Sequence, residues 1–380
     1  MYFDNAATSF PKPRRVIDEQ ARCLRTYCGN PGRGSHALSR AAAEKLYECR
    51  SEAAELFALD NPENVIFTMN ATMAINTVIK GVLQMGDHVL FSDMEHNAVY
   101  RPIYKMARAG LISYDVFPTY ATAPTRTAKE ICEGIERLIK PRTKMLICAH
   151  ASNICSATLP IAEIGAICHR HGIFFAVDAA QSAGHIPIHM QEMQIDALCA
   201  PGHKGLMGPQ GSGLLLLGDG QRIDTLMEGG SGVNSLEGSM PEESPERYEA
   251  GTLPTPAIVG LCEGIRALKR IGVEHIHEHT AELIAALRER LSKIERVRLY
   301  APYHKGAVLL FNIDGIPADR VGEMLDRQGI CVRAGYHCAA LAHASLQTPI
   351  GGAVRVSVGC FNAPAEIEKL ADAIEALCNA

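Results

Sequence analysis

The feature of this sequence that most constrains its fold is an alternation of two hydrophobic patterns over the first two thirds of the chain. Short runs that are apolar on both faces, as buried strands are, alternate with longer segments of helical periodicity. This alternation predicts a mainly parallel sheet covered by helices, with the loops that follow the strands gathered at one edge. The expected strands are 65–68, 88–91, 111–116, 145–148 and 173–177, and the expected helices are 72–83, 97–109, 127–139 and 161–171.

The last third of the chain follows a different pattern. Residues 228–256 are rich in Gly, Ser, Glu and Pro and lack a hydrophobic period, which predicts a long loop that is either functional or disordered. Beyond it, helices mix with short strands, so we expect an α/β protein with a large domain, 16–255, and a small α+β domain made of 1–15 and 256–380. The later elements are expected at 256–270, 275–294, 318–328 and 366–377 (helices) and at 297–300, 308–313, 330–333 and 354–358 (strands).

Composition excludes several classes of protein. Lys and Arg number 37 against 42 Asp and Glu, a formal charge of -5, so neither nucleic acid nor a membrane surface is an expected partner. The chain has no apolar run of about 18 residues and no signal-peptide pattern. Thirteen scattered cysteines without a CxxC pair predict reduced thiols in the cytoplasm. No metal site is expected, because the spacing of His275, His277 and His279 does not place them on one helix face.

Lys204 and Asp178 are the first candidates for chemistry. Lys204 lies in a glycine-rich turn, where a lone lysine is most often a surface residue. Asp178, however, ends a buried strand, and an isolated buried carboxylate needs a partner. A pyridinium nitrogen is such a partner, because enzymes that use pyridoxal phosphate (PLP) combine a Schiff-base lysine with an acidic group at the ring nitrogen.

These two residues, together with further segments in order, resemble class V aminotransferase-fold PLP enzymes, most closely the cysteine desulfurase and selenocysteine lyase group. The resemblance covers nearly the whole chain and implies the fold type I PLP-dependent transferase architecture, with a seven-stranded type of sheet. The segments are Asp4-Asn5-Ala6-Ala7-Thr8, Arg33-Gly34-Ser35-His36, Asn70-Ala71-Thr72, Met94-Glu95-His96-Asn97, His150-Ala151-Ser152-Asn153, Asp178-x-x-Gln181, Gly202-His203-Lys204, Glu249-Ala250-Gly251-Thr252 and Arg333-Ala334-Gly335-Tyr336-His337-Cys338.

The resemblance implies a role for each candidate residue. Lys204 would form the Schiff base and move the α-proton, Asp178 would keep the ring nitrogen protonated, and His96 would stack on the ring and donate a proton. Thr252 would reach the phosphate of the neighbouring subunit, which implies a homodimer with a shared site. The other implied cofactor contacts are Gln181, His203, Thr72, Ala71 and Asn153, and the implied substrate contacts are Arg355, Asn153, His36 and Ala7.

Cys338 decides the reaction class. The resemblance implies that its thiolate, favoured by a nearby cation and flanked by His337, takes sulfur from L-cysteine as a persulfide and leaves L-alanine. The short interval before Arg355 resembles the second type of cysteine desulfurase, which depends on a separate protein acceptor for its sulfur. Three alternatives stay open: a selenocysteine lyase, a PLP aminotransferase or C–S lyase that does not use Cys338, and a scaffold without activity.

Two departures from the family pattern bear on these expectations. Pro201 stands where the family usually has Ser or Thr, so one phosphate contact is expected to be absent. After Ala339 the chain continues with Ala340, where related sequences commonly have a proline.

Overall fold

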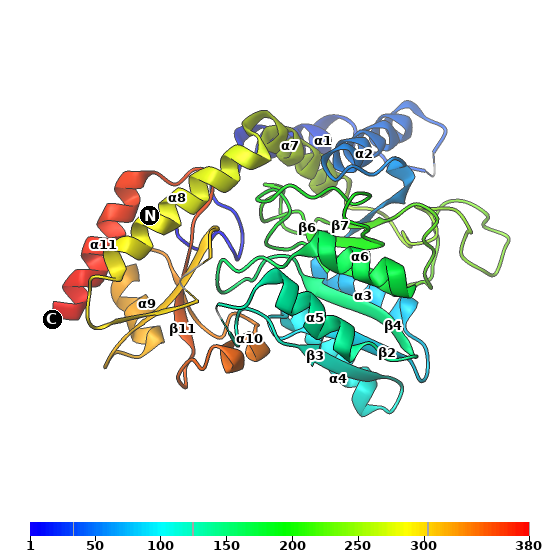
Figure 1. Cartoon of the computed structure of the whole chain (residues 1–380). Coiled ribbons are helices and arrows are strands. Elements are labelled where there is room, and N and C mark those ends of the chain that lie inside the picture. The colour runs from blue at the N-terminus through cyan, green and yellow to red at the C-terminus, as the bar shows by residue number, and fades with distance from the viewer. Residues whose placement is uncertain (33, 124, 302–303, 380) are drawn as a thin grey trace.

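A seven-stranded sheet forms the centre of the large unit in the computed structural model, which describes the 380 residues except 33, 124, 302–303 and 380 (Figure 1). The strand order is β1-β7-β6-β5-β4-β2-β3. Strands β2 to β6 run parallel, and β7 pairs antiparallel with both β6 and β1, so the predicted mainly parallel sheet is confirmed. The strands are β1 (Val65–Thr68), β2 (His88–Ser92), β3 (Ser113–Phe117), β4 (Thr143–Ala149), β5 (Phe174–Asp178), β6 (Ala197–Pro201) and β7 (Gly213–Leu217).

Helices cover both faces of this sheet because its strands are apolar on both sides. One face packs against α3 and α4, and the other packs against α2, α5, α6 and α7. Helix α7 also packs on α1, and it leads directly into α8, the first helix of the small unit. The helices are α1 (Arg14–Thr26), α2 (Ala37–Leu56), α3 (Ala71–Val82), α4 (Asn97–Arg108), α5 (Ala128–Leu138), α6 (Ile161–His171) and α7 (Thr255–Ile271), with a short 3-10 turn, η1 (Pro62–Asn64).

The small unit is built on a four-stranded antiparallel sheet of order β10-β11-β9-β8, and both chain ends lie in it (Figure 1). The N-terminal segment joins this sheet: Phe3 N–H donates to Cys331 O and Ser357 N–H donates to Phe3 O, each at 2.8 Å. Phe3 is fully buried in the core of this unit. Its elements are α8 (Val273–Leu291), β8 (Val297–Tyr300), β9 (Val308–Ile313), α9 (Ala318–Asp326), β10 (Arg333–Gly335), α10 (Ala340–Ser345), β11 (Ala353–Ser357) and α11 (Pro364–Asn379).

Two predicted elements differ from the structure. The strand expected at 330–333 begins only at Arg333, because Cys331 forms an isolated bridge with Tyr2 of the N-terminal segment instead. The short interval between Cys338 and Arg355 was expected to contain no helix or strand, but it contains the short helix α10, which begins at Ala340. Residues 218–254, all of them described, contain no helix or strand, as the predicted long loop requires.

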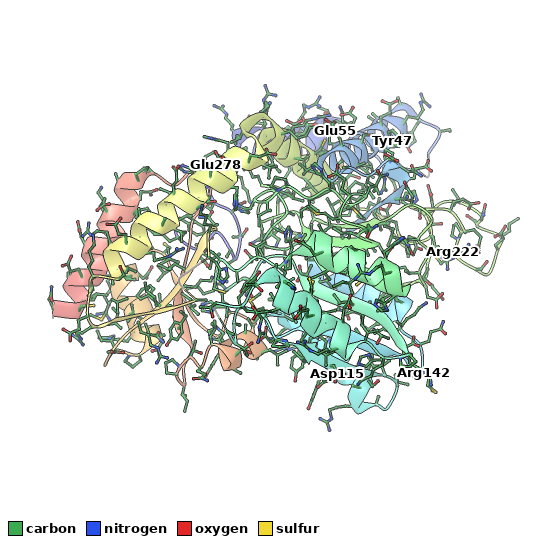
Figure 2. The ribbon with its side chains drawn as sticks, viewed as in Figure 1. Tyr47, Glu55, Asp115, Arg142, Arg222 and Glu278 are labelled. Atoms are coloured by element: carbon green, nitrogen blue, oxygen red, sulfur yellow. The ribbon has the colours of Figure 1, made fainter. Side chains whose placement is uncertain are left out.

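The outer surface of the large unit carries charged side chains such as Glu55 and Arg222 (Figure 2). Over the residues that the structure describes, no helix combines the length and the apolar character that crossing a bilayer needs. In the same residues no group of three His, Cys, Asp or Glu side chains is placed to bind a metal ion.

Candidate active site

The carboxyl ends of β5 and β6 open into a cavity of about 180 Å³ at one edge of the large sheet. Asp178 is the last residue of β5, and Lys204 lies in the turn after β6. The first turns of α3 and α4 form the other walls. Parallel strands end at the same edge, so the topology brings together segments that lie far apart in the sequence. The predicted site residues that line this cavity are Ala71, Thr72, His96, Asn153, Asp178, Gln181, His203 and Lys204.

Lys204 is held in a turn whose packing requires glycine on both sides. A Cβ atom on Gly202 would lie 2.2 Å from Ser212 Oγ, and one on Gly205 would lie 2.2 Å from Ala183 O. Burial lowers the pKa of the Lys204 amine to about 8, although the Asp178 carboxylate acts in the opposite direction. Near neutral pH, more of this amine is the neutral nucleophile than for an exposed lysine.

Asp178 brings a desolvated carboxylate to the same cavity. Its exposed fraction is 3%, and Oδ1 accepts a hydrogen bond from the Ala180 N–H at 2.9 Å. Burial raises the pKa of Asp178, while this N–H and the nearby Lys204 amine act in the opposite direction. A buried carboxylate of this kind is stabilised by a protonated partner in the cavity.

The opposite end of the cavity is suited to an anion. Asn70 caps α3 by accepting a hydrogen bond from the Met73 N–H at 2.9 Å, and the first N–H groups of the helix have no partner within it. His203 lies on the facing wall, and its Nδ1 is buried without a partner among the described residues. Burial lowers the pKa of His203 to about 4, so its ring is neutral near pH 7.

His96 caps the neighbouring helix α4 and has a defined tautomer. Its Nδ1 accepts a hydrogen bond from the Ala98 N–H at 3.0 Å, so the proton of the neutral ring is on Nε2. Burial, together with the cations Lys204 and Arg101, lowers the pKa of His96 to about 4. The ring is therefore a neutral N–H donor at the cavity wall.

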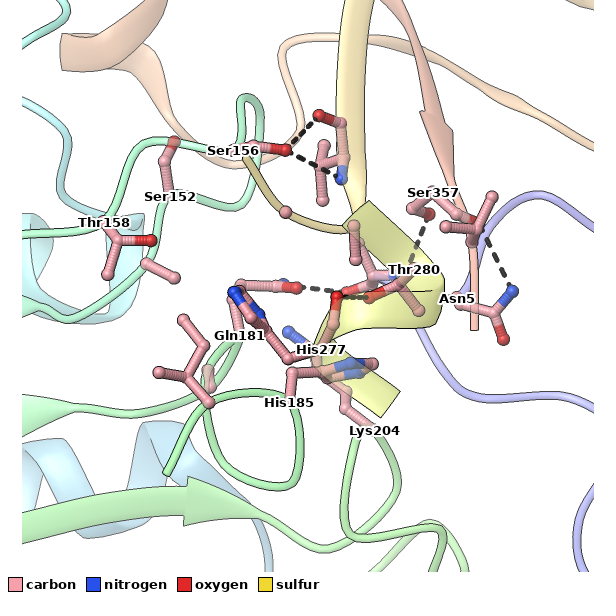
Figure 3. Close-up of a pocket in the computed structure, with 18 residues that line it drawn as sticks. Asn5, Ser152, Ser156, Thr158, Gln181, His185, Lys204, His277, Thr280 and Ser357 are labelled. Carbon is pink, nitrogen blue, oxygen red and sulfur yellow. Dashed lines mark hydrogen bonds between the residues drawn. The ribbon is translucent and has the colours of Figure 1, made fainter. Parts of the chain in front are cut away.

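A second and smaller cavity, of about 30 Å³, lies on the side of Lys204 that faces the small unit (Figure 3). It shares Gln181 and Lys204 with the first cavity. Gln181 Nε2 donates to Ala6 O at 3.0 Å, so one of its two N–H groups is already used. Ala7, a predicted substrate contact, follows in the same turn, where its N–H donates to Asp4 O at 3.0 Å.

Arg355 lies on β11 and is already paired within the chain. Its exposed fraction is 3%; Nη2 contacts Asp4 Oδ1 at 2.8 Å and Nη1 donates to Asn153 O at 3.0 Å. Its Nε is buried without a partner among the described residues. Arg333 also contacts Asp4, at 2.9 Å. A substrate carboxylate that binds Arg355 must therefore share it with Asp4 or displace Asp4.

Cys338 is exposed in a groove of about 630 Å³ that shares Thr72 and His96 with the main cavity. Two contacts of 2.7 Å hold its turn: the Asn97 N–H donates to Cys338 O, and Asn153 Nδ2 donates to His337 O. Burial, with Arg355 nearby, lowers the pKa of His337 to about 3. His337 is therefore neutral, so the nearby cation expected to favour the thiolate must be another group.

Two predicted site residues, His36 and Thr252, lie away from the cavities of their own chain. His36 is exposed at the start of α2, where its Nδ1 accepts from the Ser39 N–H at 3.3 Å. Thr252 is exposed at the end of the long loop. Neither lines the two cavities or the Cys338 groove, so their roles remain predictions; for Thr252 the expected contact is with a neighbouring subunit. Arg33, from the same segment as His36, lies outside the described residues.

Asp4 and Glu95 lie in two of the segments that resemble the family, but no role was predicted for either residue. Asp4 pairs with both arginines of the site. Glu95 is fully buried and accepts a hydrogen bond from the Ala149 N–H at 3.0 Å, and its burial raises its pKa to about 8. It ties the segment before His96 to β4. For Glu95 the sequence did carry a signal. Its carboxylate follows the apolar strand 88–91 with no Lys or Arg beside it, which indicates a buried structural contact.

Comparisons with known proteins identify the family of this chain. The model of the family Aminotransferase class-V matches residues 1–370. A probable cysteine desulfurase of Methanothermobacter thermautotrophicus is 32% identical, covering 99% of this chain and 94% of that protein. A cysteine desulfurase of Escherichia coli is 31% identical, covering 98% and 92%. A solved apo structure of a cysteine desulfurase from Thermococcus onnurineus aligns with a TM-score of 0.89 at 30% identity, covering 100% and 94%.

Proposed function

Because this chain belongs to the class V aminotransferase family, whose members generally use PLP, we propose that it is a cysteine desulfurase. The proposed reaction converts L-cysteine to L-alanine and transfers the sulfur to Cys338 as a persulfide. The main support is the exposed Cys338, in a groove that adjoins the cavity of Lys204 and Asp178. An aminotransferase or a C–S lyase has no need of a thiol at that place.

The groups around the cavity fit PLP. The Lys204 amine, with its lowered pKa, suits the aldehyde carbon, and the buried Asp178 carboxylate suits a protonated pyridine nitrogen. The start of α3 and the unpartnered Nδ1 of His203 suit the phosphate. Pro201 lines the same cavity without a hydroxyl or an N–H, so it adds no hydrogen bond there.

Bound PLP supplies an electron sink that makes the α-proton of an amino acid removable. The residues of this chain bind the substrate and move its protons. Lys204 Nζ takes the proton from the substrate Cα, and His96 Nε2–H is a proton donor beside it. The Arg355 guanidinium binds the substrate carboxylate, through a planar donor set that suits it.

Cys338 completes the reaction by attack on the sulfur of the substrate. A bond forms between Cys338 Sγ and the substrate sulfur, and the bond between that sulfur and Cβ breaks. Its electron pair remains with the carbon skeleton, which takes up one proton at Cβ, regains at Cα the proton that Lys204 removed, and leaves as L-alanine. Sulfur is thereby oxidised and carbon reduced within the two reactants, so no external oxidant or reductant is needed until the persulfide is unloaded.

The proposed enzyme works as a homodimer and passes its sulfur to another protein. Thr252, exposed and away from the cavity of its own chain, is available to contribute to the site of a second subunit. Cys338 lies on a short segment whose two carbonyl groups are fixed by hydrogen bonds. Because this limits how far the thiol can move, the acceptor protein has to bind close to it. All thirteen cysteines are free thiols in the structure, a state suited to the cytoplasm.

The products of L-cysteine turnover test this proposal. The protein, loaded with PLP and supplied with dithiothreitol, should release L-alanine and sulfide in equal amounts. Pyruvate and ammonia in place of alanine would identify a C–S lyase, and a requirement for a keto-acid acceptor would identify an aminotransferase. A kcat/KM for L-selenocysteine far above that for L-cysteine would identify a selenocysteine lyase.

A further inference from the structure

Three side chains beside Cys338 have no part in the proposed reaction, although they are hydrogen-bonded in a row. His337 Nδ1 lies 3.2 Å from His343 Nε2, and His343 Nδ1 lies 2.9 Å from Thr348 Oγ1. At the other end, His337 Nε2 lies 3.2 Å from Arg333 O. The two histidine rings are stacked with their centroids 5.4 Å apart, and the exposed fraction of His343 is 2%. We call His337, His343 and Thr348 the histidine chain.

The direction of each hydrogen bond in the histidine chain follows from the carbonyl at its end. Arg333 O only accepts, so His337 Nε2 carries a proton and Nδ1 of the neutral ring accepts. His343 Nε2 must then donate to it, and the Thr348 hydroxyl must donate to His343 Nδ1. Burial and the nearby Arg355 hold the pKa of His337 at about 3 and that of His343 at about 4, so both rings are neutral. Every ring nitrogen of the histidine chain therefore has a hydrogen-bond partner other than Cys338.

The turn next to the histidine chain has an unfavourable backbone conformation. The φ angles of His337 and Cys338 are +50° and +55°, in the left-handed region that residues with a Cβ seldom occupy. Such a conformation persists only where the surroundings determine it. Asn97 and Asn153 donate hydrogen bonds to the two carbonyl groups of the turn, and His343 fixes the ring of His337.

We propose that His343 and Thr348 are positioning residues that fix the Cys338 thiol for attack on the substrate sulfur. The proposal rests on the proposed function, because it requires that Cys338 receives the sulfur. His337 and Cys338 are adjacent, so a change in the His337 backbone rotates the thiol away from the cavity. A displacement of about 1 Å at a reacting group lowers a rate by about 10²-fold.

Matched pairs of variants test the positioning role. Thr348→Val keeps the shape but removes the hydroxyl donor, whereas Thr348→Ser retains it. His343→Leu removes the Nε2 donor, whereas the amide of His343→Gln can donate from a similar place. The Val and Leu variants should lower kcat for L-cysteine by roughly 10- to 100-fold at unchanged KM and unchanged cofactor absorbance. The Ser and Gln variants should recover most of that rate.

L-Selenocysteine separates positioning from folding, since selenide leaves more easily than sulfide and needs less help from a thiolate. Thr348→Val and His343→Leu should keep their rate on this substrate. Equal losses on both substrates, with a lower melting temperature, would reduce the histidine chain to structural support and overturn the positioning role. Wild-type rates on L-cysteine in both variants would overturn it as well.

Cys338→Ala, measured beside them, keeps the two proposals separate. If Cys338→Ala converts L-cysteine at the wild-type rate, the proposed function fails. If Cys338→Ala is inactive while Thr348→Val and His343→Leu are fully active, the proposed function stands and only the positioning role fails.

Discussion

The cofactor cavity and the Cys338 turn adjoin each other but are built in different ways. Asp178 ends β5 and Lys204 follows the neighbouring strand β6, so sheet topology alone brings them together. Cys338 lies in a turn with two left-handed residues, held by the distant Asn153 side chain and by the nearby His343 side chain. Variants in the cavity should therefore abolish chemistry, whereas those around the turn should reduce a rate by placing an intact thiol badly.

The largest effect is expected at the centre of the cavity. Lys204→Ala should lower turnover of L-cysteine by roughly 10⁴-fold, the upper end of what a positioned proton-transfer group contributes. Borohydride reduction of the PLP-loaded variant, followed by mass spectrometry, should show no cofactor attached to the protein. An adduct that persists in the variant would show that a different lysine holds the cofactor.

Asp178→Asn, which preserves size, should cost about 10²- to 10³-fold in kcat because a preorganised charge is lost. It should also shift a pH profile. PLP binds covalently to the neutral amine, so the rate of loading the apoprotein rises as pH passes the pKa of Lys204, about 8. The Asp178 carboxylate raises that pKa, so its removal should move the midpoint to lower pH. An unmoved midpoint would mean that the two groups do not interact.

Arg355 belongs to the small unit, and its proposed role is to bind the substrate carboxylate. Arg355→Lys keeps the charge and loses the planar pair of donors, so KM for L-cysteine should rise roughly 10- to 150-fold, equivalent to about 1.5–3 kcal/mol. The kcat should change much less. An unaltered KM would assign Arg355 to a structural ion pair with Asp4, which it already contacts at 2.8 Å.

The smallest effect on turnover is expected at a contact between the two units that the proposed reaction does not use. Ser156 Oγ donates to Val308 O at 2.6 Å and accepts from the Val308 N–H at 3.1 Å (Figure 3). Ser156→Ala leaves two buried backbone groups unpaired, a loss of about 1–3 kcal/mol in unfolding free energy. Calorimetry should show a melting temperature lower by a few degrees, with L-cysteine turnover nearly unchanged. A large loss of turnover at constant melting temperature would contradict the assignment of Ser156 to stability alone.

The sequence predicted the cavity better than the turn for a physical reason. Strand periodicity and glycine-rich turns are local signals, and they placed Asp178 at the end of a buried strand and Lys204 in a turn, although β6, the strand before that turn, was not predicted. The contact of Asp4 with Arg355 joins positions 351 apart and leaves no local pattern. His343 contacts His337 and Thr348, six and five residues away, but these contacts depend on the left-handed turn at 337–338, which no periodicity reveals.

The same limit explains the misplaced strand. The run 330–333 is apolar enough for a strand, but Cys331 pairs with Tyr2. This contact joins segments far apart in the sequence and leaves no local pattern. For His36 and Thr252 the missing information is of another kind, because a single chain does not bring them to its own cavity.

The most direct test of the central claim is the mass of the peptide that contains Cys338. The PLP-loaded protein should be treated with L-cysteine in the absence of a reductant and then alkylated and digested. The account predicts one added sulfur atom on the Cys338 peptide, and in Cys338→Ala no added sulfur on that peptide and no alanine formed. Wild-type desulfuration by Cys338→Ala, or an unmodified Cys338 peptide in a protein that has released alanine, would contradict the account.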